Sequence, residues 1–287
     1  MTVKIAYGGF WGGFDPNKNW LSQMFKGYFN EDIEFSADVK NSDIAVCSVF
    51  SNVETNARRI FYTGESRKTF IKDGDILLGF DPTDKIKNSY RLPLWMLYIN
   101  WWEEDYKTED CCYTVDLDYL TSKISFNEVE KILSRKYPCA MVASNLTHNR
   151  LAAFTCINDN LFSVHGYGKV FNNIYYSGSK IELLKDYLFN ISFENTIAEG
   201  YVTEKLFEAK LSGCIPIYWG DEWCKKDFNE KSFIYCNDMT YSDLIEKIKI
   251  LLSSKDATFD MVSEPLFKEK PSLDGLYTFF DDIKLKG

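Results

Sequence analysis

The residues best suited to chemistry lie in one stretch, FENTIAEGYVTEKLFEAKLSG, which runs from Phe193 to Gly213. Two apolar runs typical of buried strands, YLFNISF and CIPIYWG, flank it. Glu204 and Lys205 stand where the spacing of apolar residues predicts the start of a helix. A glutamate suits the positive end of a helix, whereas a lysine there needs a negative neighbour such as a phosphate. A nearby carboxylate can also accept hydrogen bonds from both hydroxyls of a ribose. The stretch therefore favours a nucleotide site over a solvated helix start with a chance lysine.

The position of this stretch in the chain supports the same interpretation. Thr203 is predicted to cap the helix and Gly213 to end it. The preceding loop then follows the carboxyl end of a strand, which is where open α/β sheets bind ligands. Arg150 follows the apolar run CAMVAS in the same way, and a guanidinium matches two phosphate oxygens. For both cations, Lys205 and Arg150, the alternative is ordinary ion pairing at the surface.

Composition restricts the class of protein. With 287 residues, of which 45% are hydrophobic, the chain is long enough for about two globular domains. Its net charge of −9 argues against general nucleic-acid binding, which needs a basic surface. The eight cysteines are too dilute for a disulfide scaffold, so we expect reduced, buried thiols and a cytoplasmic protein. No apolar run reaches the roughly 18 residues of a membrane span, and the start MTVKIAYGGF lacks the features of a signal peptide.

Strand-like and helix-like segments alternate along the chain. Strands are expected at VKIAY, IEFSA, DIAVCSVF, RRIFYTG and ILLGF, with helices over residues 20–29 and over LPLWMLYINWW. The pattern weakens from about residue 105 to 138, and strand–helix alternation resumes at CAMVAS. This order predicts an α/β protein with parallel sheets. We expect two doubly wound domains, residues 1–134 and 135–287, that face a cleft.

Several segments together resemble the α1,3-fucosyltransferases, glycosyltransferase family 10. They are FENTIAEGYVTEKLFEA followed by GCIPIYWG, then FYTGES, GFD and RLPLW in the first half, and VASN with Arg150 soon after. The resemblance implies the GT-B fold, with two Rossmann-like domains. It places the donor GDP-fucose on the C-terminal domain and the acceptor on the N-terminal one. It also implies inverting transfer from GDP-β-L-fucose to the 3-hydroxyl of an N-acetylglucosamine or glucose unit, for which N-acetyllactosamine is a suitable acceptor.

The resemblance also suggests a role for individual residues. Glu65, behind an apolar strand and a glycine turn, matches the general base, and Glu194 is its rival. Arg150 and Lys205 match the cations that stabilise the departing diphosphate. The expected donor contacts are Glu194, Asn195, Tyr201, Glu204 and, as a third cation, Lys169. Trp11 and Trp95 are the candidates for contact with the acceptor sugar, although the aromatic segment around Trp95 also suits a core.

No metal ion and no cofactor beyond the donor are expected. Asp73–Asp75 and Asp116–Asp118 spell DxD, the metal-carrying triplet of other glycosyltransferases, but each lacks a third ligand nearby. Two alternatives stay open: a GT-B transferase for another GDP-sugar, and a nucleotide-sugar binding protein without turnover. The C-terminal segment YTFFDDIKLKG is short and mixed in charge, unlike the basic tails of bacterial family members. At most weak, peripheral membrane association is therefore expected.

Overall fold

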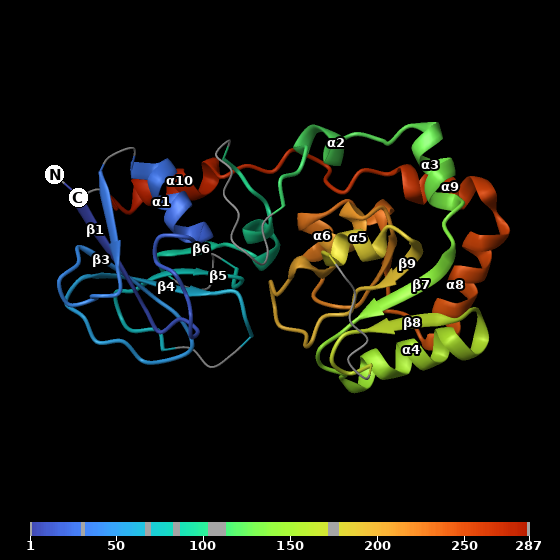
Figure 1. Ribbon diagram of the computed structural model, residues 1–287, viewed down its shortest axis with the longest axis horizontal. Helices are drawn as coiled ribbons and strands as arrows, with labels where there is room; N and C mark the ends of the chain where they lie inside the picture. Colours follow the sequence, from blue (N-terminus) through green and yellow to red (C-terminus); the bar gives the residue numbers. More distant parts are fainter. Residues whose placement is uncertain are drawn as a thin grey trace. The chain divides into compact units, whose positions relative to one another are not determined.

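The computed structural model describes residues 2–29, 32–66, 70–82, 87–102, 113–171 and 178–285. They form two compact units (Figure 1). Unit 1 comprises Met1–Val115, Glu199–Tyr201 and Ser272–Gly287, and unit 2 comprises Asp116–Ala198 and Val202–Pro271. Each unit contains one parallel sheet, as the alternation of strands and helices in the sequence predicts.

Unit 1 is built on a six-stranded parallel sheet in the order β2-β1-β3-β4-β5-β6. Its strands are β1 (Val3–Gly8), β2 (Ile33–Ser36), β3 (Ile44–Cys47), β4 (Arg58–Thr63), β5 (Ile76–Gly79) and β6 (Ser89–Arg91). The described helices of this unit are α1 (Trp20–Phe29), the 3₁₀ helix η1 (Leu94–Tyr98) and α10 (Asp274–Asp282). Phe280 of α10 stacks on Phe25 of α1, with 6.1 Å between ring centroids, so the C-terminal segment completes this unit (Figure 1).

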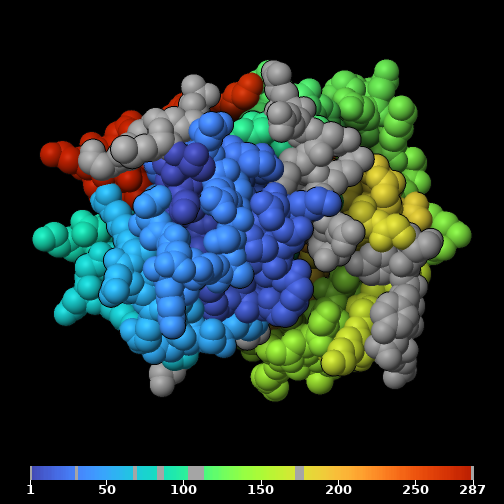
Figure 2. Space-filling view, turned by 60° about the vertical axis from the view of Figure 1, so that its left-hand side comes forward, coloured from blue at the N-terminus to red at the C-terminus, as the bar shows by residue number. Residues whose placement is uncertain are grey.

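The other face of this sheet is covered by connecting loops. Cys47, Phe61 and Leu77 form a small core there, against residues of the loops that precede and follow β3 and β4. The connections 37–43 and 48–57 contain no helix. They are shorter than the dozen or so residues that a helical crossover needs. In space-filling view, the N-terminal segments of this unit, coloured dark to light blue, make one continuous surface (Figure 2).

Unit 2 contains a five-stranded parallel sheet in the order β11-β10-β9-β7-β8. Its strands are β7 (Tyr137–Val142), β8 (Val164–Tyr167), β9 (Tyr187–Ile191), β10 (Ile215–Tyr218) and β11 (Ile234–Tyr235). The helices described in this unit are α2 (Leu117–Thr121), α3 (Phe126–Leu133), α4 (His148–Asn160), α5 (Lys180–Leu184), α6 (Glu204–Leu211), α7 (Cys224–Asp227), η2 (Glu230–Ser232), α8 (Tyr241–Ser253) and α9 (Lys255–Ser263).

Helices cover both faces of the unit 2 sheet. Residues of α3, α4, α8 and α9 share one core with the strands, whereas residues of α5 and α6 pack on the opposite face. The chain leaves β7 through α4 to β8 on one side, and returns through α5 to β9 on the other. The strand order therefore reverses at β7, which makes the carboxyl ends of β7 and β9 a topological switch point. Ligands of open α/β sheets bind at such a point.

The structure differs from three expectations about the bounds of the units and the elements. The units change at Val115 rather than after residue 134, because α3 buries Val129 and Ile132 in the core of unit 2. Residues 272–287 likewise belong to unit 1 rather than to a continuous C-terminal domain. The segment LPLWMLYINWW forms only the short helix η1 instead of a long one.

Candidate active site

Arg150 is fixed at the switch point by its backbone neighbours. Its side chain lies one turn into α4 and the residue is buried, with 4% of its surface exposed. Nε and Nη2 donate to the carbonyl oxygen of Phe193 at 3.0 and 2.6 Å, and Nη1 donates to that of Asn145 at 2.8 Å. The guanidinium thus joins the loop after β7 to the end of β9. Carbonyl acceptors orient the guanidinium without cancelling its positive charge.

Glu194 follows β9 and is fully buried. Its carboxylate accepts hydrogen bonds from the backbone N and Oγ1 of Thr203, at 2.8 and 2.9 Å to Oε1, and from the hydroxyl of Tyr218 at 3.2 Å. Lys205 Nζ lies 3.1 Å from Oε2. These contacts fasten the start of α6 to the end of β9. The carboxylate is thus enclosed by internal donors, an arrangement that suits it to positioning the start of α6, and its direct contact with the donor stays a prediction.

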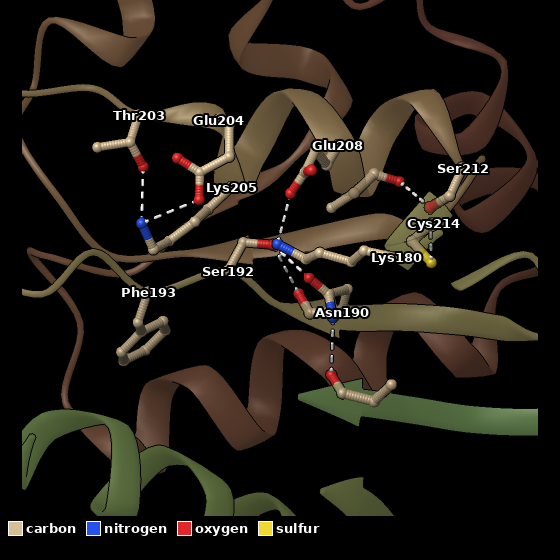
Figure 3. A network of polar contacts seen from close by, with 12 residues as sticks. Lys180, Asn190, Ser192, Phe193, Thr203, Glu204, Lys205, Glu208, Ser212 and Cys214 are labelled. Carbon is tan, nitrogen blue, oxygen red and sulfur yellow. Dashed lines mark hydrogen bonds and ion pairs between the residues drawn. The ribbon is translucent and has the colours of Figure 1, made fainter. Parts of the chain in front are cut away.

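Lys205 lies between two carboxylates at the start of α6. Its ammonium donates to Thr203 Oγ1 at 2.8 Å and is 3.3 Å from Glu204 Oε1, as Figure 3 shows. The Lys205 side chain is 17% exposed and that of Glu204 is 16% exposed. Both side chains are therefore accessible in part, and their charged groups are held in place by their neighbours. A cation and an acceptor lie side by side at a helix N-terminus, as a nucleotide diphosphate and ribose would require.

Thr203 differs from its expected role. It occupies the N-cap position, but its side chain makes no capping bond to the first turn of α6. Its hydroxyl donates to Glu194 instead, because that buried carboxylate is the stronger acceptor. The first turn of α6 is thus left without an N-cap side-chain oxygen, and its N–H groups suit an anionic ligand.

A second ion pair supports the same helix one turn further on. Lys180, the first residue of α5, lies 2.6 Å from Glu208 Oε2, and both side chains are largely buried, at 16% and 5% exposed (Figure 3). Burial acts to raise the pKa of Glu204, but the charges of Lys205 and Lys180 outweigh it and lower that pKa to about 2. Glu204 is therefore a carboxylate at neutral pH and can accept hydrogen bonds from hydroxyls. Lys180 was not among the candidates from the sequence, because its partner Glu208 lies on the next helix and no local pattern joins the two residues.

The remaining donor-side candidates occupy different settings. Asn195, in the loop after β9, and Lys169, in the turn after β8, are exposed. Tyr201 is buried, belongs to unit 1, and packs edge-on against Phe80 with 5.0 Å between ring centroids. The ring of Tyr201 is therefore enclosed by protein, and its contact with the donor stays a prediction.

The candidates of unit 1 lie at the carboxyl edge of its sheet, with one exception. Glu65 is exposed two residues beyond β4, and its backbone N–H and carbonyl both bond to Oγ1 of Thr63. Trp11 follows β1 and is 52% exposed. Trp95, in η1, is only 4% exposed, so its indole belongs to the core and offers little face to a sugar.

One aspartate of each DxD triplet has a structural contact. Across the part of the chain that the structure describes, no three or more His, Cys, Asp or Glu side chains converge to hold a metal ion. Asp75 is buried against Arg59, 3.2 Å away, and Asp116 caps α2. The triplets therefore have structural explanations.

No helix among the described residues has both the length and the apolar character needed to span a bilayer.

Comparison with known proteins identifies the family. Residues 5–98 match the family model for the alpha-(1,3)-fucosyltransferase FucT N-terminal domain. Residues 132–260 match the model for the C-terminal part of glycosyltransferase family 10 (fucosyltransferase). The chain belongs to glycosyltransferase family 10. The resemblance in the motifs around Lys205 and Arg150 is thereby confirmed, and so is the α/β fold with two parallel sheets.

Individual relatives support the same family assignment. The alpha-(1,3)-fucosyltransferase FucT of Helicobacter pylori is 33% identical over 251 residues, which are 80% of this chain and 51% of that protein. This chain thus spans about half the length of that relative. A crystal structure of an alpha1,3-fucosyltransferase with GDP-fucose is 28% identical, with a TM-score of 0.75, and the match covers 98% of this chain and 90% of that one. A structure with GDP has a TM-score of 0.73 at 29% identity, covering 100% and 91% of the two chains.

Proposed function

We propose that this family 10 chain is an inverting α1,3-fucosyltransferase that uses GDP-β-L-fucose. The acceptor is the 3-hydroxyl of an N-acetylglucosamine or glucose unit in a glycan such as N-acetyllactosamine. The observation that carries the proposal is the pair of fixed cations, Arg150 and Lys205, at the switch point of unit 2. The solved relatives with GDP-fucose and with GDP support the choice of donor.

In this proposal the diphosphate binds to unit 2. Arg150 and Lys205 contact its oxygens, and the N-terminal amides of α6 face the same charge. Their positions are set by Phe193 and Glu194 before any ligand arrives, so little reorganisation is needed as negative charge grows on the departing GDP. This arrangement stabilises the leaving group without a metal ion.

The nucleoside is held by neighbouring polar groups. Glu204 accepts hydrogen bonds from the two ribose hydroxyls, which suits a carboxylate that stays charged beside Lys205 and Lys180. Asn195 and Lys169 are exposed in the loops after β9 and β8, where they supply an amide and a third cation to the donor. Both loops follow strands at the carboxyl edge of the sheet, as donor contacts require.

The chemistry is a single displacement. Glu65 removes the proton from the acceptor hydroxyl, and the oxygen attacks the anomeric carbon of fucose on the face opposite the diphosphate. The bond from that carbon to the diphosphate oxygen breaks, and GDP leaves with the electron pair. The configuration therefore changes from β to α. Glu65 is an exposed carboxylate, unlike the enclosed Glu194, which favours it as the base.

We also propose a cytoplasmic location, with at most weak membrane association. The cysteines that the structure describes include five buried free thiols, Cys47, Cys139, Cys214, Cys224 and Cys236. Buried, unpaired thiols are typical of proteins in a reducing compartment.

A transfer assay tests the proposed function. The protein is incubated with N-acetyllactosamine and either GDP-fucose or GDP-mannose, and both GDP release and the fucosylated product are measured. We expect product and acceptor-dependent GDP release with GDP-fucose only. Product with GDP-mannose instead would indicate a transferase for another GDP-sugar. Tight GDP-fucose binding without release of GDP would indicate a binding protein without turnover.

A further inference from the structure

An aromatic cluster follows the strands at the carboxyl edge of the unit 1 sheet. It consists of Phe10, Trp11, Phe14, Phe50 and Tyr62. The first three belong to the loop after β1, Phe50 to the loop after β3, and Tyr62 to the end of β4. Phe10 stacks on Phe14 at 4.2 Å and lies parallel to Tyr62 at 6.4 Å. Trp11 meets Phe50 edge-on at 6.1 Å.

The outer members of the cluster face solvent. Trp11 is 52% exposed and Phe50 is 45% exposed, whereas Tyr62 is only 6% exposed. The cluster therefore has a buried base, made by Tyr62 and the stacked rings, and an exposed pair above it. Adjacent exposed aromatic rings on a supported base mark a binding surface more often than a core.

The exposed pair is held in place by the backbone. Gly9 has a φ of +71°, and a Cβ added there would lie 2.7 Å from the carbonyl oxygen of Ser51 and 2.9 Å from that of Ser48. The Phe50 N–H donates to the carbonyl oxygen of Gly9 at 2.9 Å. The loop after β1 is thus packed directly on the loop after β3, which requires glycine at position 9 and sets Trp11 beside Phe50.

The same cluster reaches the turn that carries Glu65. Strands β1, β3 and β4 are neighbours, with Gly8 paired to Cys47 and Cys47 to Phe61. The Tyr62 hydroxyl lies 2.6 Å from the position that a Cβ on Gly64 would take, so its ring ends against the residue before Glu65. Since strands are spaced by about 4.8 Å, the strands of Phe50 and Trp11 lie roughly 5 and 10 Å from that of Glu65.

We propose that Trp11 and Phe50 form a stacking subsite for the acceptor glycan. It binds the sugar unit next to the one that receives fucose, and so selects an oligosaccharide over a monosaccharide. A pyranose ring presents an apolar face of C–H groups, which aromatic rings bind without charge. The inference rests on the proposed function, with Glu65 at the reacting hydroxyl. The net charge of −9 disfavours the alternative of an anionic lipid surface as the occupant.

Acceptor selectivity tests the subsite. The ratio of kcat/KM for N-acetyllactosamine to that for N-acetylglucosamine is measured for the wild type, Trp11→Ala and Phe50→Ala. We expect the ratio to fall about tenfold in each variant, mainly through a higher KM for the disaccharide. Trp11→Phe and Phe50→Tyr, which keep an aromatic ring, should recover most of the ratio. Phe126→Ala, at a 64% exposed aromatic residue of unit 2, is the matched control.

Three outcomes would refute the proposal that Trp11 and Phe50 form a stacking subsite. One is an unchanged ratio in both alanine variants, the second is an equal loss on both acceptors, and the third is no recovery with the aromatic replacements. GDP affinity and circular dichroism of each variant establish that it is folded. If the wild type transfers no fucose to either acceptor, the proposed function fails by itself. Calorimetry of disaccharide binding to the wild type and to Trp11→Ala then still tests the subsite. Equal affinities of the two proteins, or no binding to either, would refute it.

Discussion

Replacing Glu194 by Gln should destabilise the start of α6, because the Glu194 side chain joins the start of that helix to the end of β9. The fully buried carboxylate accepts from Thr203 and Tyr218 and lies 3.1 Å from Lys205. Removing one partner of a buried ion pair destabilises a protein by about 3–5 kcal/mol. Lys205 keeps Glu204 at 3.3 Å and is partly exposed, so we expect about 2–3 kcal/mol for Glu194→Gln. For a unit of this size, that corresponds to a fall in Tm of about 4–12 °C.

Thermal unfolding and GDP affinity measure this effect. The matched control is Glu182→Gln, which breaks the exposed pair between Glu182 of α5 and Lys185, the residue just after that helix. Exposed pairs contribute about 0–1 kcal/mol, so the control should leave Tm and GDP affinity nearly unchanged. Glu194→Gln should lower Tm and weaken GDP binding at least about tenfold, because Lys205 loses the carboxylate that positions it. A variant as stable as the control, with unchanged GDP affinity, would refute the positioning role of Glu194.

The remaining predictions concern the catalytic groups and one partly buried lysine. Arg150→Ala and Lys205→Ala should each lower kcat/KM at least about tenfold, or about 1.4 kcal/mol, and near-normal transfer by both would contradict the phosphate assignment. Glu65→Gln should retain the fold and GDP binding while transfer collapses; normal turnover would place the base elsewhere. Lys210 donates to the carbonyl oxygens of Met261 and Val262, and burial lowers its pKa from 10.5 to about 7. Between those values Lys210 binds more protons in the unfolded chain than in the folded one, so its own contribution to stability should rise with pH from about 7 to 10.5. Lys210→Met should flatten that rise in urea unfolding, and an unchanged slope would exclude Lys210 as its source.

The positions of the main site residues were predictable because they depend on local pattern. Apolar runs end just before Arg150 and just before the loop to Lys205, and parallel strands bring those ends to one edge of a sheet. The helix beginning at Glu204 also follows from the spacing of its apolar residues. The sequence therefore predicted which helix starts carry the cations, and the structure places both helix starts after the strands that meet at the switch point.

The partners of these residues were less predictable because they depend on contacts between distant segments. Thr203 is a good N-cap by sequence, but a buried carboxylate nine residues earlier takes its hydroxyl. The pairing of Lys180 with Glu208 joins two helices, and periodicity within one helix gives no sign of it. The sequence pattern predicts Phe50 at the end of an apolar strand. In the structure that strand ends at Cys47, and the ring of Phe50 is exposed beside Trp11.

The division into units was missed for a related reason. Residues 105–138 have a weak pattern, so no local signal shows where one core stops and the next begins. The capping box of Ser125 and Glu128 marks the start of α3 and was a usable signal for a helix there. Whether that helix joins unit 1 or unit 2 depends on its packing against α9, which lies far along the chain.

A crystal structure of the protein with GDP would show where the diphosphate binds. We predict that oxygens of the diphosphate lie within about 2.7–3.2 Å of the guanidinium of Arg150 and the ammonium of Lys205. The ribose hydroxyls should lie at the carboxylate of Glu204. A nucleotide bound away from the carboxyl ends of β7 and β9, or a diphosphate that contacts neither cation, would contradict the account.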